Sequence, residues 1–130
     1  MLTREDVESY LLRAELTHEE VGEGMWVAQL DEAGGTKLVV HFSPPVLVFR
    51  LKVLDIPQDQ QKCAGLYKRL LELNATDLVH AAYALEESDV ILTETLELEN
   101  LDFNEFQATV DSFQVALASH LELLAPFRDC

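Results

Sequence analysis

The chain has 130 residues, about the length of one ordinary domain, and its 48% hydrophobic and 25% charged residues are typical of a sequence that folds. It carries 24 Asp and Glu against 9 Lys and Arg, a net charge of −15. This charge repels phosphate backbones and anionic lipid headgroups, which argues against binding to nucleic acid or to a membrane. It either favours basic or aggregation-prone partners or simply keeps the domain soluble.

The first residues and the cysteines indicate a cytoplasmic protein. The N-terminal segment lacks the basic-then-apolar order of a secretory signal, and no apolar run approaches the roughly 20 residues that span a bilayer. Cys63 and Cys130 form neither a CxxC pair nor a disulfide framework, so we expect two free thiols. The expected organisation is a single domain over residues 1–130.

The N-terminal half predicts one helix and then three strands. Thr3 is a suitable helix cap, with Asp6 reaching back to it, and the helix is expected to end near Glu15. Short β-rich runs follow, separated by a glycine turn in residues 31–35 and by Pro44-Pro45. Together the runs read as an antiparallel meander. The expected strands cover residues 25–30, 37–43 and 46–53.

The C-terminal half predicts a helix, a hairpin and a last helix. Pro57 suits the first position of the second helix, and Asn74 suits a left-handed cap at its end. Asp102 caps the last helix, which Pro126 ends. The expected hairpin strands cover residues 78–86 and 89–97. The order αβββαββα predicts an α+β fold in which helices pack on an antiparallel sheet.

No set of residues has the spacing of a catalytic or cofactor site. The four histidines are far apart and belong to no HExxH motif, and no glycine-rich loop joins a strand to a helix. Ser43 and Ser88 lack a nucleophile signature, and Cys63 falls on an apolar helix stripe. We therefore predict no metal, no cofactor and no enzymatic activity.

Two surfaces carry more apolar residues than one layer of helices can cover. Both faces of the meander are apolar, so one face is either ordinary scattered hydrophobic surface or a site for an extended partner segment. The second helix and the following hairpin carry a further apolar set, which is typical of a symmetric dimer. That set comprises Leu66, Tyr67, Leu70, Leu71 and Tyr83.

Two segments carry a family resemblance. Leu70-Leu71-Glu72-Leu73-Asn74, before the hairpin, and Leu98-Glu99-Asn100-Leu101-Asp102, before the last helix, are similar to the YbjN-like pattern. The element order over nearly the whole chain resembles the type III secretion chaperones of the Tir-chaperone-like group.

The resemblance implies a homodimer that binds a partner polypeptide in extended form. Pairing through the second helix would correspond to Leu66, Tyr67 and Leu70. Partner segments over the first helix and the meander would correspond to Val27, Val39, Val48 and Phe49.

We therefore expect a non-enzymatic, chaperone-like protein that holds a segment of a protein client. The alternative is a YbjN-like regulatory or scaffold domain that binds a folded partner without holdase activity. A third possibility, from another class, is an enzyme or small-ligand binder without a recognisable motif.

Overall fold

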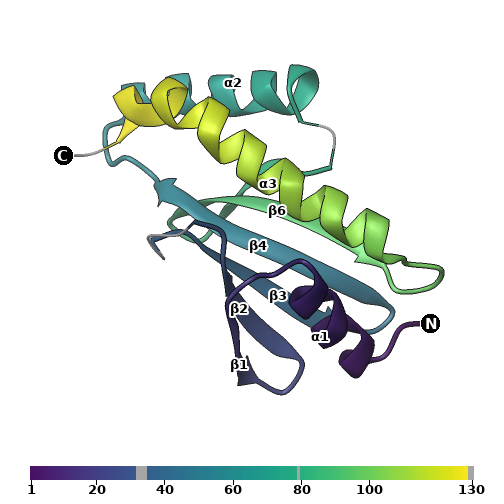
Figure 1. Cartoon of the computed structure of the whole chain (residues 1–130). Coiled ribbons are helices and arrows are strands. Elements are labelled where there is room, and N and C mark those ends of the chain that lie inside the picture. Colours follow the sequence, from purple (N-terminus) through teal and green to yellow (C-terminus); the bar gives the residue numbers. More distant parts are fainter. Residues whose placement is uncertain (32–34, 79, 129–130) are drawn as a thin grey trace.

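In the part of the chain that the structure describes, six strands form one antiparallel sheet in the order β1-β2-β3-β4-β6-β5, and the helices pack on it (Figure 1). The computed structural model describes residues 1–31, 35–78 and 80–128. The predicted glycine turn at Gly34 and the predicted free thiol of Cys130 lie outside these residues. The elements are α1 (Arg4–Arg13), β1 (His18–Gly22), β2 (Met25–Gln29), β3 (Lys37–Ser43), β4 (Val46–Asp55), α2 (Gln60–Thr76), β5 (Ala82–Glu86), β6 (Asp89–Glu97), α3 (Phe103–Leu124) and the short 3-10 helix η1 (Ala125–Phe127).

The predicted α+β class and the packing of helices on an antiparallel sheet are confirmed, and the structure adds the edge strand β1. This strand pairs with β2, with Glu19 opposite Val27. Four of its five residues are exposed, so its sequence lacks the alternation of apolar and polar residues that marks a half-buried strand. Pairing with β2, rather than burial, holds β1 in place.

Local hydrogen bonds explain where the helices begin. The predicted capping box at Thr3 and Asp6 is present, and the side chain of Asp102 accepts a hydrogen bond from the Glu105 backbone, as expected. The second helix does not begin at Pro57. Its cap is Asp59, whose side chain accepts hydrogen bonds from two backbone N–H groups of the first turn, so the helix begins at Gln60.

Two other predicted boundaries were wrong. Asn74 does not cap α2, because the helix continues to Thr76. Strand β5 begins at Ala82 rather than at residue 78, since the chain first has to leave the end of α2. By contrast, β3 and β6 have the predicted bounds, 37–43 and 89–97.

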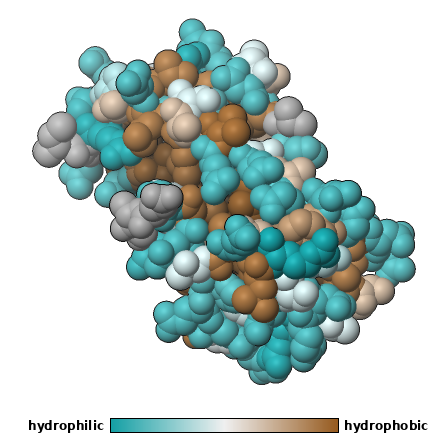
Figure 2. Space-filling model, in the orientation of Figure 1, coloured by the Kyte–Doolittle hydropathy of each residue, from teal (hydrophilic) through white to brown (hydrophobic). Residues whose placement is uncertain are grey.

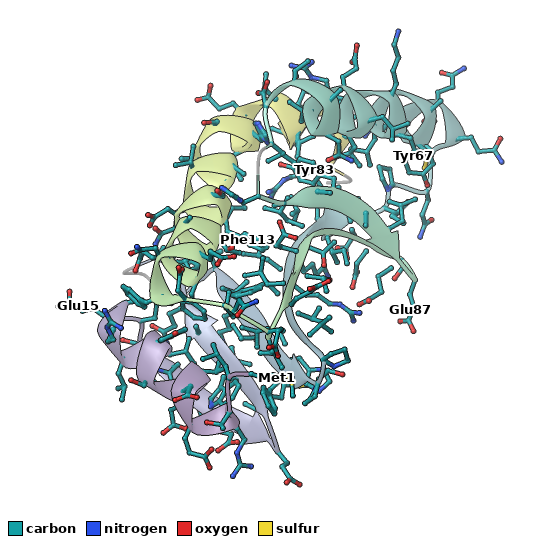
Figure 3. All side chains as sticks on the ribbon, turned by 90° about the vertical axis from the view of Figure 1, so that its right-hand side faces the viewer. Met1, Glu15, Tyr67, Tyr83, Glu87 and Phe113 are labelled. Atoms are coloured by element: carbon teal, nitrogen blue, oxygen red, sulfur yellow. The ribbon has the colours of Figure 1, made fainter. Side chains whose placement is uncertain are left out.

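The core lies between one face of the sheet and the helices. The ring of Phe49 in β4 lies 5.5 Å from Phe106 and 6.3 Å from Phe113, both on α3. Figure 3 shows Phe113 between α3 and the sheet. Val7 and Leu11 of α1 are fully buried in the same core. Within the described ranges, no helix has the length and apolar character needed to cross a membrane.

Candidate functional site

The sheet face opposite the core carries a patch of apolar side chains on β2, β3 and β4. Val27 lies opposite Val39, and in the next row His41 lies between Met25 and Val48. Directly opposite residues share a face of an antiparallel sheet, with Cβ atoms roughly 5 Å apart, so these side chains form one patch. We call it the valine face; it consists of Met25, Val27, Val39, His41, Val46 and Val48, all half-buried.

Three of the four predicted partner-binding residues lie on the valine face. Val27, Val39 and Val48 do not belong to the buried core, whose residues lie on the other side of the sheet. Phe49 is different: it is 0% exposed and packs against α3. Successive side chains of a strand point to opposite faces, so Phe49 points into the core because its neighbour Val48 points away from it. Its assignment as a partner-binding residue is corrected accordingly.

The predicted dimer residues divide between two sides of α2. Leu66 and Leu70 are 0% and 4% exposed and face the core of their own chain, which corrects their assignment to an outer surface. Tyr67 is half-buried, and Leu71, one helical turn later, is 68% exposed. The neighbouring strand β5 carries Leu85, which is 49% exposed. The outer apolar surface of this region therefore consists of Tyr67, Leu71 and Leu85.

A buried polar network joins α2, β5 and α3. His120 is 2% exposed, with its Nδ1 2.7 Å from the Tyr83 hydroxyl and its Nε2 3.2 Å from Asp77 Oδ2. Burial raises the pKa of Tyr83. The pKa of Asp77 is lowered by hydrogen bonds, first from Thr76 and then from His120. The network satisfies buried polar atoms at a junction of three elements, so its role is structural.

Asn74 reinforces this junction. Its Nδ2 donates to the carbonyl of Tyr83 at 3.2 Å, and its Oδ1 accepts from the Tyr83 N–H at 2.7 Å. The side-chain amide thus pairs with the outer edge of β5 as a neighbouring strand would. Figure 3 shows Tyr83 between the sheet and the helices that hold it. The sequence did not predict the Asn74–Tyr83 and Tyr83–His120 contacts, because each joins residues of different elements.

Neither the histidines nor the cysteine assembles a reactive site in the part of the chain that the structure describes. No group of three His, Cys, Asp or Glu residues there is placed to hold a metal ion. His18 bonds through Nδ1 to the carbonyl of Leu16 at 2.8 Å, while His41 lies on the valine face. The Cys63 thiol is half-buried and donates to the carbonyl of Pro57 at 2.8 Å.

The sequence matches the CesT_Tir_1 family model over residues 2–129. The chain belongs to this family of type III secretion chaperone-like proteins. The recognition made from the sequence is therefore confirmed. A comparison with curated proteins found no match.

Solved structures share the fold of this CesT_Tir_1 chain at low sequence identity. A chain of the heterodimeric ExoU–SpcU complex from the type III secretion system of Pseudomonas aeruginosa has a TM-score of 0.70 at 17% identity, over 92% of this chain and 98% of that chain. YbjN from E. coli, described as a putative transcription regulator, has a TM-score of 0.67 at 9% identity, over 94% and 93%.

A third similar structure is that of the Yersinia pestis type III secretion chaperone SycH, in complex with a stable fragment of YscM2. Its TM-score is 0.64 at 13% identity, over 90% of this chain and 98% of that chain. These likenesses extend over most of each chain, and they agree in the α+β fold.

Proposed function

We propose that this CesT_Tir_1 protein is a non-enzymatic chaperone that holds an extended segment of a protein client on the valine face. The observation that carries the proposal is the apolar patch of Val27, Val39 and Val48, on a sheet face where no helix of the described chain packs. Similar folds solved as complexes, ExoU–SpcU and SycH with a YscM2 fragment, support a polypeptide client.

Burial of the valine face is the proposed source of affinity. Each apolar side chain removed from water contributes about 25 cal/mol per Å² of buried area, which favours client segments with apolar residues. The net charge of −15 keeps loaded complexes apart in solution. The protein then acts in the cytoplasm by keeping an aggregation-prone segment covered until it is released.

We further propose a homodimer formed through the outer side of α2 and through β5. Tyr67, Leu71 and Leu85 are apolar residues available there, and Leu66 and Leu70 support this surface from within the core. The valine face is centred on β2–β4, and β5 lies at the other end of the sheet from β1. A dimer formed at α2 and β5 therefore leaves the valine face of each subunit uncovered.

The experiment compares Val48→Asp with the matched control Val115→Asp, an exposed valine of α3 that is 63% exposed. The readout is light scattering from insulin that aggregates after its disulfides are reduced, with circular dichroism to verify folding. We expect the wild-type protein and Val115→Asp to suppress the aggregation and Val48→Asp to fail while remaining folded. Equal suppression by both variants would contradict the proposal.

One further variant tests the burial of Phe49, and one further outcome distinguishes the chaperone from a regulatory domain. Phe49→Asp is expected to unfold the chain, because it places a carboxylate in the core. The similarity to YbjN favours a second candidate function, a regulatory domain that binds a folded partner without holdase activity. That candidate predicts no suppression of insulin aggregation by the wild-type protein, together with capture of a partner that resists proteolysis while bound.

A further inference from the structure

A groove opens between the first residues of β3, the last residues of β4 and the C-terminal half of α3. Its volume is about 550 Å³. Its apolar lining includes Leu117, which is half-buried, and Leu121, which is 52% exposed. Figure 2 shows hydrophobic side chains gathered in this region of the visible face. An apolar floor that remains open to solvent can contact a side chain from another molecule.

The rim of this groove is basic although the chain is strongly acidic. Lys37, Lys52 and Arg128 line it, and the only carboxylate lining it among the described residues is that of Asp55. Lys52 Nζ already lies 2.8 Å from Asp55 and 3.4 Å from Asp89, and these contacts raise the pKa of Lys52. Lys37 and Arg128 form no ion pair with another residue of the described ranges. Among the residues that the structure describes, these two cations therefore have no carboxylate partner that a client would have to displace.

The groove opens on the α3 side of the sheet, and the valine face lies on the opposite side. Lys37 and Val39 are two residues apart on β3, so their side chains share a face, about 7 Å apart along the strand. Val39 in turn lies opposite Arg50 of β4, whose guanidinium is already paired with Glu86 at 2.7 Å. A client segment on the valine face therefore has to pass around the end of the sheet at Lys37 to reach the groove.

We propose that the groove binds an acidic, apolar segment of the client: an apolar side chain rests on Leu117 and Leu121, while neighbouring carboxylates face Lys37 and Arg128. The inference rests on the proposed function, because it specifies the chemistry of a client segment beyond the valine face. Charge complementarity carries it. Carboxylates are repelled by most of a chain with a net charge of −15, so a basic rim directs them to this one groove.

The test measures fluorescence anisotropy of short labelled peptides with the full-length protein at physiological salt. The probe alternates leucine and glutamate; one control peptide replaces leucine with serine, which removes the apolar side chains. We expect the leucine–glutamate peptide to bind and the serine–glutamate peptide to bind much more weakly. If the leucine–glutamate peptide shows no saturable binding, the proposal is overturned.

Matched variants locate the site. Lys37→Glu is expected to weaken binding of the leucine–glutamate peptide about tenfold, because an attraction becomes a repulsion. Lys68→Glu makes the same charge change at an exposed lysine of α2 and is expected to change binding less than about twofold. Leu121→Ser should weaken binding, whereas Leu123→Ser, on the same helix outside the groove lining, should not. Equal effects within either pair would overturn the proposal.

Failure of this inference is distinguishable from failure of the proposed function. If insulin aggregation is suppressed and Val48→Asp abolishes the suppression, but the peptide does not bind, only the groove assignment fails. If the peptide binds with the expected variant pattern but Val48→Asp suppresses aggregation as well as Val115→Asp does, the assignment of the client site to the valine face is wrong and the groove assignment stands.

Discussion

Replacement of Asn74 by alanine is expected to lower the free energy of unfolding by about 2 kcal/mol, because two hydrogen bonds are lost together. Both join its side-chain amide to the backbone of Tyr83, at 3.2 and 2.7 Å. Each such bond contributes about 1 kcal/mol net, and the part-buried N–H of Tyr83 is left without its acceptor. In a domain of this size the loss corresponds to a drop in Tm of roughly 6–10 °C.

The assay is urea unfolding followed by the fluorescence of Trp26, the one tryptophan of the chain, which is fully buried. The control is Asn104→Ala, which removes the same type of side chain from an exposed position in the first turn of α3. That exposed position is expected to cost less than about 0.5 kcal/mol. Asn74→Asp keeps the acceptor for the Tyr83 N–H and loses the donor to the Tyr83 carbonyl. It should therefore lower the free energy of unfolding by at least about half as much as Asn74→Ala does.

The reasoning is refuted if Asn74→Ala lowers the free energy of unfolding no more than Asn104→Ala does, at an unchanged urea dependence. That result would mean that the amide contacts add nothing to the attachment of β5 to α2. The measurement also bears on the proposed dimer, since its surface depends on the same two elements. A destabilised variant that still forms dimers would separate the two effects.

Two further predictions concern polar contacts. Tyr83→Phe should lower the free energy of unfolding in the same urea experiment by about 1–3 kcal/mol, because it leaves Nδ1 of the buried His120 without its partner. The control Tyr10→Phe, at a half-buried tyrosine of α1, should be nearly neutral. The pKa of Asp6 is lowered from its ordinary value of 3.8 by hydrogen bonds from the backbone and the hydroxyl of Thr3. The ionised Asp6 side chain therefore stabilises the fold above pH 3.8, and this stabilisation is lost as the pH falls below 3.8. The difference in stability between the wild-type chain and Asp6→Asn should therefore shrink from neutral pH to about pH 3 in urea titrations; a constant difference would contradict this sign.

Local patterns in the sequence predicted the parts of the fold that local interactions determine. The caps at Thr3 and Asp102 were predictable because each depends on a side chain and a backbone group three residues away. The bounds of β3 and β6 were predictable from strand periodicity and turn residues. Strand β1 was not predictable, because its sequence has no alternation of apolar and polar residues and only its pairing with β2 makes it a strand.

Local patterns did not predict which residues of the candidate site are buried and which are exposed. Alternation separates Val48 from Phe49, but which of them the helices bury depends on the long-range packing of α3 against β4. Helical periodicity likewise separates Leu70 from Leu71, and only the packing shows that Leu70 faces inward. The groove and the Asp77–His120–Tyr83 network escaped prediction because each collects residues from several elements distant in sequence.

The pairing of β4 with β6 has a consequence for how the chain folds. Strands β1 to β4 pair as successive neighbours, so the first part of the sheet can assemble through short loops. The ladder from Val46–Glu97 to Asp55–Asp89 instead encloses α2 and β5 in one long loop, whose closure costs entropy before any contact is gained. Formation of this ladder is therefore the expected slow step, and until it forms, the edge of β4 and the apolar side of α3 remain exposed to other chains.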